Sequence, residues 1–199
     1  INSWRNSLKD MYITLNDTDI PLNAGVAIEY NIPQTSKRID FLISGYNKDN
    51  KGAVVIIELK QWEKLTAIDS QESIVETFIN GAERRVVHPS YQAWSYATLI
   101  KDYNQYVQEK DIQLNPCAYL HNYKRIDNDP IDANQYQDVL QDAPAFTYVQ
   151  LRRLQEYIKK HICKGDNEEK LFRIEHGTIS QSKQLQDAIG SMLKGNQEF

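Results

Sequence analysis

Acidic and basic side chains follow a strongly apolar segment of this sequence. Residues 54–57 read VVII, a run typical of a buried β-strand, and Glu58 and Lys60 come directly after it. Because side chains alternate along a strand, Glu58 and Lys60 point to the same side. Asp40, in the segment RIDFLIS across a polar turn, is placed to join them. Two carboxylates and an ammonium group together could hold a divalent cation and position a water molecule.

Two interpretations of these charges are open. In the first, Glu58 and Lys60 form a simple ion pair at a solvent-exposed strand end. In the second, Asp40 and Glu58 form an acidic cup for Mg²⁺ (or Mn²⁺), because magnesium prefers one or two carboxylates together with water and a substrate phosphate. Lys60 would then orient the attacking water or stabilise the charge of the transition state.

The same residues resemble the PD-(D/E)xK phosphodiesterase superfamily, the fold of many restriction and repair nucleases. Asp40 matches the first acid of its motif, and Glu58 and Lys60 match the ExK element. The sequence departs from the motif at one position, since Ile39 stands where the proline of the superfamily's name precedes the first acid. The resemblance implies a metal-dependent nuclease, an Mg²⁺-dependent phosphodiesterase that acts on nucleic acid, with DNA as the expected substrate.

The resemblance also implies a role for each site residue. The implied metal ligands are Glu29, Asp40, Glu58 and the backbone carbonyl of Leu59. The implied catalytic residues are Asp40, Glu58, Lys60 and Gln61. Gln92 and Tyr96 match the QxxxY motif of the RecB-like branch, where such residues contact DNA or support the metal ligands; residues four apart share a helix face. Lys37 and Arg38 lie beside Asp40 in the sequence and are either phosphate contacts or part of a polar loop.

The similarity is closer to one bacterial family, in which an N-terminal nuclease-like domain precedes a Schlafen-type superfamily I helicase/ATPase domain. Its N-terminal region is similar to the stretches YNIPQTSKRIDFLI, VVIIELKQWE, HPSYQAWSYA, PCAYLHNY and SKQLQDAIGSMLKGN. The sequence contains no GxxxxGK[ST] phosphate loop and begins with Ile rather than Met. We therefore expect a domain cut from a longer protein, whose ATPase/helicase domain would be its partner.

The pattern of apolar residues predicts an α/β fold that positions these groups. We expect a restriction-endonuclease-like core, a central mixed β-sheet flanked by helices, in a single domain over residues 1–199. Its core spans about 20–125 and its helical C-terminal part about 145–195. The predicted elements are a helix at 2–15, a strand at 26–31, a hairpin of RIDFLIS with AVVIIELKQ, a loop and short helix at 69–78, a helix at 90–108, a strand from Pro116 or later, a polar surface segment at 127–142, a helix in the second half of 146–163, and a helix at 182–197.

Composition narrows the class of protein further. Hydrophobic residues make up 41% and charged residues 25%, which is ordinary for a globular chain and argues against disorder. No apolar run approaches the roughly 20 residues that span a bilayer. The two cysteines form no CxxC pair, which favours a reducing cytoplasm and gives no support for a zinc site.

The net charge of −4 is not typical of a nucleic-acid-binding domain, so two other functions stay open. One is a nucleic-acid-binding module that keeps the nuclease fold without cutting. The other is a protein-interaction domain with no nucleic-acid role.

Overall fold

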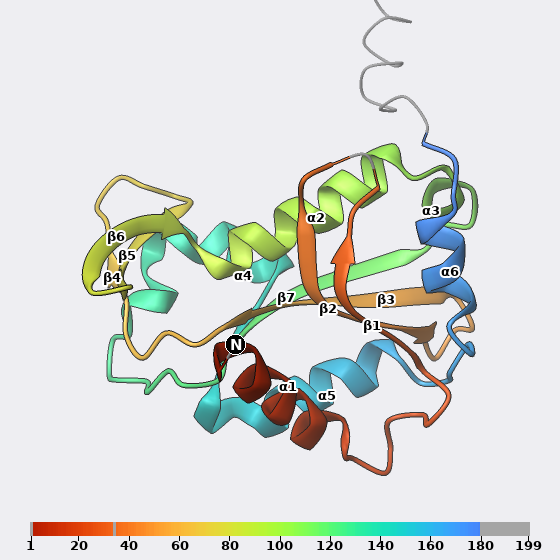
Figure 1. Ribbon diagram of the computed structural model, residues 1–199, viewed down its shortest axis with the longest axis horizontal. Coiled ribbons are helices and arrows are strands. Elements are labelled where there is room, and N and C mark those ends of the chain that lie inside the picture. Colours follow the sequence, from red (N-terminus) through yellow and green to blue (C-terminus); the bar gives the residue numbers. More distant parts are fainter. Residues whose placement is uncertain (1, 34, 180–199) are drawn as a thin grey trace, which may run out of the picture.

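The computed structural model describes residues 2–33 and 35–179, with side chains from Ser7 onward, and its centre is a five-stranded sheet (Figure 1). The strand order is β1-β2-β3-β7-β8. The strands are β1 (Gly25–Asn31), β2 (Arg38–Tyr46), β3 (Gly52–Lys60), β7 (Gln113–Leu120) and β8 (Ala145–Thr147). The pairs β1–β2 and β2–β3 are antiparallel, and β3–β7 and β7–β8 are parallel. The predicted restriction-endonuclease-like α/β core with a central mixed sheet is confirmed.

Helices cover both faces of this sheet (Figure 1). Helices α1 (Asn2–Leu15) and α5 (Leu151–His161) pack on one face, against an apolar cluster that includes Phe41 and Ile57. Helices α2 (Pro89–Tyr103), α3 (Gln105–Glu109) and α6 (Glu169–Glu175) pack on the other, where Leu42 and Ile56 are buried. Because β3 is buried on both faces, its apolar residues run without a break instead of alternating with polar ones.

A second, smaller sheet follows β3 and corrects one prediction. Residues 69–78 were expected to form a loop and a short helix, but β4 (Thr66–Ala67), β5 (Ile74–Ile79) and β6 (Ala82–Val87) form a three-stranded antiparallel sheet. Asn80 and Gly81 both have positive φ, 51° and 82°, in a two-residue loop between β5 and β6. Such loops join tight hairpins because their twist matches that of the strands. The dipeptide Asn-Gly was the sequence signal for this hairpin.

Two boundaries also differ from the prediction. Strand β7 begins at Gln113, three residues before Pro116. Strand β8 pairs with residues 118–120 of β7, so the missing N–H of Pro116 interrupts no bond to β8. The helix expected over 90–108 divides at Asn104, whose side-chain oxygen accepts from the Val107 N–H and starts α3.

The segment 127–142, expected at the surface, is partly buried. It forms the short turns Pro130–Asp132 and Asn134–Tyr136 and the helix α4 (Gln137–Asp142). Ile131 and Tyr136 are fully buried, and the Tyr136 hydroxyl donates to the Ile74 carbonyl, which ties the small sheet to the core. The helix predicted at 182–197 lies outside the described residues. No helix among the described residues is long and apolar enough to cross a membrane.

Helix α6, which the sequence did not predict, is held by a buried ion pair. Lys170 Nζ lies 3.4 Å from Asp166 Oδ2, and both side chains are almost completely enclosed. The other oxygen, Asp166 Oδ1, accepts from the Ser44 hydroxyl at 2.9 Å and from the Gly25 N–H at 3.2 Å. This pair joins α6 to β1 and β2.

Candidate active site

The predicted acids meet where β2 and β3 run side by side. Phe41 pairs with Ile57, so Asp40 and Glu58 occupy the next position along this antiparallel pair. Asp40 Oδ2 accepts a hydrogen bond from the Leu59 N–H at 2.9 Å, which fixes its carboxylate against β3. These two acids lie side by side on the β2–β3 hairpin, as the sequence predicts.

Glu58 is a buried acid with one oxygen in use. Its side chain is 2% exposed, and Oε2 has no hydrogen-bond partner among the described residues. Burial raises its pKa to about 7, Lys60 opposes this shift, and Asp40 adds to it. A buried, unpartnered carboxylate oxygen is costly in free energy and calls for a ligand or a proton.

Lys60 is held by two side chains. Its Nζ lies 2.6 Å from Glu58 Oε1 and donates to Gln92 Oε1 at 3.1 Å. Gln92 in turn donates through Nε2 to the Tyr96 hydroxyl at 2.9 Å. Because Gln92 and Tyr96 lie one turn apart on α2, one helix face presents both to the strand end. The structure thus brings the ExK and QxxxY residues into one hydrogen-bonded chain.

The other predicted residues lie around this group. Glu29, on β1, forms a partly exposed ion pair with Arg38, with 2.9 Å between the charged atoms. Among the described residues no group of three or more His, Cys, Asp or Glu side chains is arranged to hold a metal, so Glu29 as a third acidic ligand stays a prediction. Arg38 and the Leu59 residue line a cleft at the site, while Lys37 is exposed in the turn before β2.

The residues present fit a two-carboxylate metal site. Asp40 and Glu58 supply hard oxygen ligands, and the buried Oε2 of Glu58 is the unpaired atom that a cation would satisfy. Magnesium commonly keeps several waters and uses one or two carboxylates, so a third acid is not required.

A second polar group, which the sequence analysis missed, lies beside Gln61. Ser7 Oγ of α1 lies 2.9 Å from His121 Nε2, and Gln61 Nε2 is 3.5 Å from the same hydroxyl. Asp10 Oδ2 is 2.9 Å from His121 Nδ1, but off the line of a hydrogen bond. The spacing of Ser7 and Asp10, three residues apart on a helix, was the available signal.

The order Ser–His–Asp is that of a nucleophile, its base and an orienting acid. However, the His121 side chain is fully enclosed, so its ring cannot reach the leaving group of a substrate. Burial lowers its pKa, against the effect of Asp10. We therefore interpret the contacts of Ser7 and Asp10 with His121 as the interactions that fix α1 beside the end of β3. Ser7 in turn contacts Gln61.

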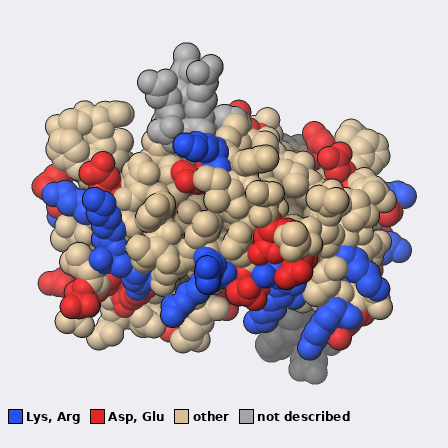
Figure 2. Space-filling model, turned by 90° about the horizontal axis from the view of Figure 1, so that it is seen from below, with Lys and Arg blue, Asp and Glu red and all other residues tan. Residues whose placement is uncertain are grey.

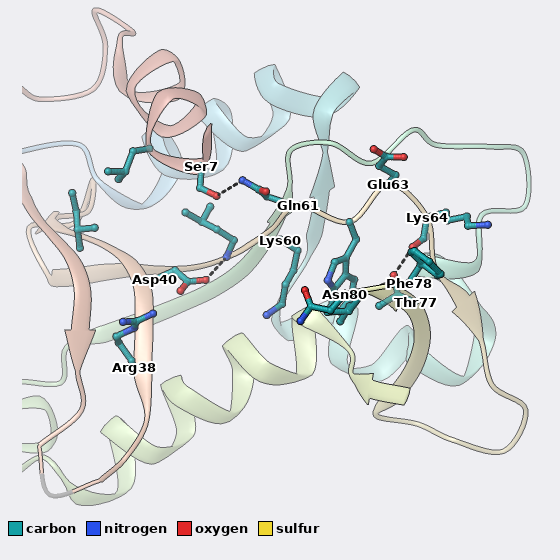
Figure 3. Close-up of a pocket in the computed structure, with 15 residues that line it drawn as sticks. Ser7, Arg38, Asp40, Lys60, Gln61, Glu63, Lys64, Thr77, Phe78 and Asn80 are labelled. Atoms are coloured by element: carbon teal, nitrogen blue, oxygen red, sulfur yellow. Dashed lines mark hydrogen bonds between the residues drawn. The ribbon is translucent and has the colours of Figure 1, made fainter. Parts of the chain in front are cut away.

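A cleft of about 800 Å³ opens at this end of β3 (Figure 3). Asp40, Lys60 and Gln61 line it together with Ser7 of α1. The tip of the β5–β6 hairpin, residues 77–80, contributes another wall. Asp40 and Lys60 therefore face a space that is large enough for part of a polymer chain, and Glu58 lies buried behind Lys60.

Comparison with protein-family models, with curated proteins and with solved structures finds no match to this chain. Its function must be inferred from the geometry of the site.

Proposed function

We propose that this chain is a metal-dependent nuclease domain that hydrolyses phosphodiester bonds, with DNA as the expected substrate. The observation that carries the proposal is the buried Glu58, whose Oε2 is unpaired, in contact with Lys60 and next to Asp40 in the β2–β3 pair; Asp40 and Lys60 line a large cleft. A strand end in a plain structural role would not require an unsatisfied acid.

Asp40 and Glu58 would hold Mg²⁺ or Mn²⁺ through their carboxylates. The bound ion would supply Lewis-acid polarisation of the phosphate and lower the pKa of a coordinated water. Lys60, which lines the cleft and is kept in place by Gln92 and Tyr96, would stabilise the negative charge that develops on the phosphate. Gln61 lies next to it along the same wall.

The Lys60–Glu58 contact also favours a second candidate, a nucleic-acid-binding module that does not cut. An ammonium group 2.6 Å from Glu58 already neutralises that acid without a metal. In this case Asp40 and Glu58 would not bind a cation. The link to an ATPase/helicase domain in a longer protein also stays a proposal from the sequence.

A cleavage assay tests the nuclease proposal. We expect the wild-type protein to cut labelled DNA in Mg²⁺ or Mn²⁺, and Lys60→Met to reduce the rate by roughly 100-fold or more, since removing one stabilising donor costs about that much. Lys51→Met is the matched control, because Lys51 is an exposed lysine in the turn at the far end of β3. Equal cleavage by wild type and Lys60→Met would contradict the proposal.

A further inference from the structure

The hairpin that forms the second wall of the cleft is a rigid element. Its two-residue turn at Asn80 and Gly81 fixes the tip, and the Thr77 hydroxyl, almost fully buried, donates to the Lys64 carbonyl at 2.7 Å. Val75 at its base is completely buried in the core. The tip is therefore held in one position across from Asp40 and Lys60 (Figure 3).

Two aromatic side chains line this cleft. Phe78, on the hairpin, is 58% exposed, whereas Val75, three residues before it on the same strand, is completely buried. Trp62, on the loop after β3, is partly buried, and its ring centre lies 5.5 Å from Lys60 Nζ. A ligand that covers an exposed phenylalanine ring is stabilised by the contact, because the contact removes apolar surface from water.

Polar and charged groups accompany these rings. Arg38 and Lys64 line the same cleft, and Asn80 brings an amide to its edge. Cations that contact phosphate, combined with aromatic rings on which bases stack, are the means by which proteins bind single-stranded nucleic acid. Stacking requires an unpaired base, because the faces of bases inside a duplex already contact their neighbours.

The size of the cleft agrees with such a ligand. Its volume of about 800 Å³ lies within the roughly 300–1,000 Å³ of pockets that enclose small ligands. A short stretch of one strand fits this description, and a whole duplex does not.

We propose that the cleft binds an unpaired strand, either single-stranded nucleic acid or a frayed duplex end, with Phe78 as a stacking platform for a base. This inference rests on the proposed nuclease function and names its substrate class. It makes Phe78 a residue that determines specificity, since it contacts the substrate away from the carboxylates.

Binding without cleavage tests this inference. The probes are a short labelled oligothymidylate and a labelled blunt duplex, and fluorescence anisotropy is measured at low salt with Ca²⁺ in place of Mg²⁺. We expect Phe78→Ala to weaken binding of the single strand by roughly tenfold, because stacking on one base contributes about 1–3 kcal/mol. Duplex binding, which is weaker in the wild type, should change less than twofold.

Two further variants complete the design. Phe172→Ala is the matched control, because Phe172 is 60% exposed on α6, which lies away from the hairpin (Figure 1). Its binding should equal that of the wild type. Phe78→Trp keeps an aromatic face and should restore single-strand binding. Thermal unfolding of each variant shows whether the fold is kept.

The outcomes separate this inference from the nuclease proposal. Unchanged single-strand binding by Phe78→Ala, an equal loss for the duplex, or no binding by the wild type overturns the inference, even if cleavage still depends on Lys60. Single-strand binding that depends on Phe78, without cleavage in Mg²⁺ or Mn²⁺, supports the inference and contradicts the nuclease proposal.

Discussion

Single residues at this site have separate tasks. Glu58 offers a buried oxygen, Asp40 is fixed by a backbone N–H, and Lys60 is held between Glu58 and Gln92. The sequence predicted that these residues meet, because strand alternation and helix periodicity decide which side chains share a side. It could not predict that Glu29 pairs with Arg38, since that contact depends on how β1 lies against β2.

His88 leads to a prediction about pH at the residue scale. It is fully buried, its Nδ1 accepts from the Ser90 N–H at 3.1 Å, and its Nε2 lies 3.2 Å from the Ile131 carbonyl oxygen. His88 therefore caps the N-terminus of α2. Burial lowers its pKa to about 4, so the folded protein keeps the ring neutral.

In the unfolded chain a histidine has a pKa of about 6.5, so between about pH 6.5 and pH 4 the unfolded state binds a proton at His88 and the folded state does not. The contribution of neutral His88 to stability is complete above about pH 6.5 and is lost as the pH falls toward 4. We therefore expect the free energy of unfolding, measured in urea, to fall between about pH 7.5 and about pH 5. This fall should be about 2 kcal/mol smaller in His88→Asn than in the wild type. The exposed His176→Asn is the control, and an identical pH dependence in wild type and His88→Asn would contradict the assignment.

Whole elements were predicted where one local pattern determines them. The β2–β3 hairpin and α2 follow from an apolar run and from helical spacing after a proline. The β5–β6 hairpin was missed because β6, AERRVV, is charged and largely exposed, so the Asn80-Gly81 turn is the clearest sequence signal for it. Helix α6 was missed because it is short and depends on Lys170, a charged residue that is buried only through its tertiary partner.

Helix α6 gives a prediction about stability. Lys170→Ala leaves the buried Asp166 without its charged partner, and breaking a buried ion pair costs about 3–5 kcal/mol. We expect a loss near the lower value, because Ser44 and the Gly25 N–H still donate to Asp166. Chemical denaturation measures this loss.

The exposed pair of Lys51 and Asp111 provides the comparison for that measurement. Lys51→Ala should cost at most about 1 kcal/mol, as exposed pairs do. If Lys170→Ala were no more destabilising than Lys51→Ala, the buried pair would not hold α6.

At the scale of the whole molecule, the negative net charge does not by itself favour binding of a polyanion. The net charge is −4, and on the face seen in Figure 2 the Lys and Arg side chains lie among Asp and Glu side chains. Recognition of a polyanion would therefore depend on the cleft.

The contact of Ser7 with His121, which joins residues 114 positions apart, shows why sequence patterns alone could not define that cleft.

Titration calorimetry with Mn²⁺ tests the central claim, that Asp40 and Glu58 form a metal site, most directly. At about pH 8 Glu58 is mostly deprotonated, as a metal ligand must be. We predict that the wild type binds Mn²⁺ and that Glu58→Gln, which keeps the shape of the side chain, does not. The exposed Glu156→Gln should bind as the wild type does. No binding by the wild type, or equal binding by Glu58→Gln, would contradict the claim.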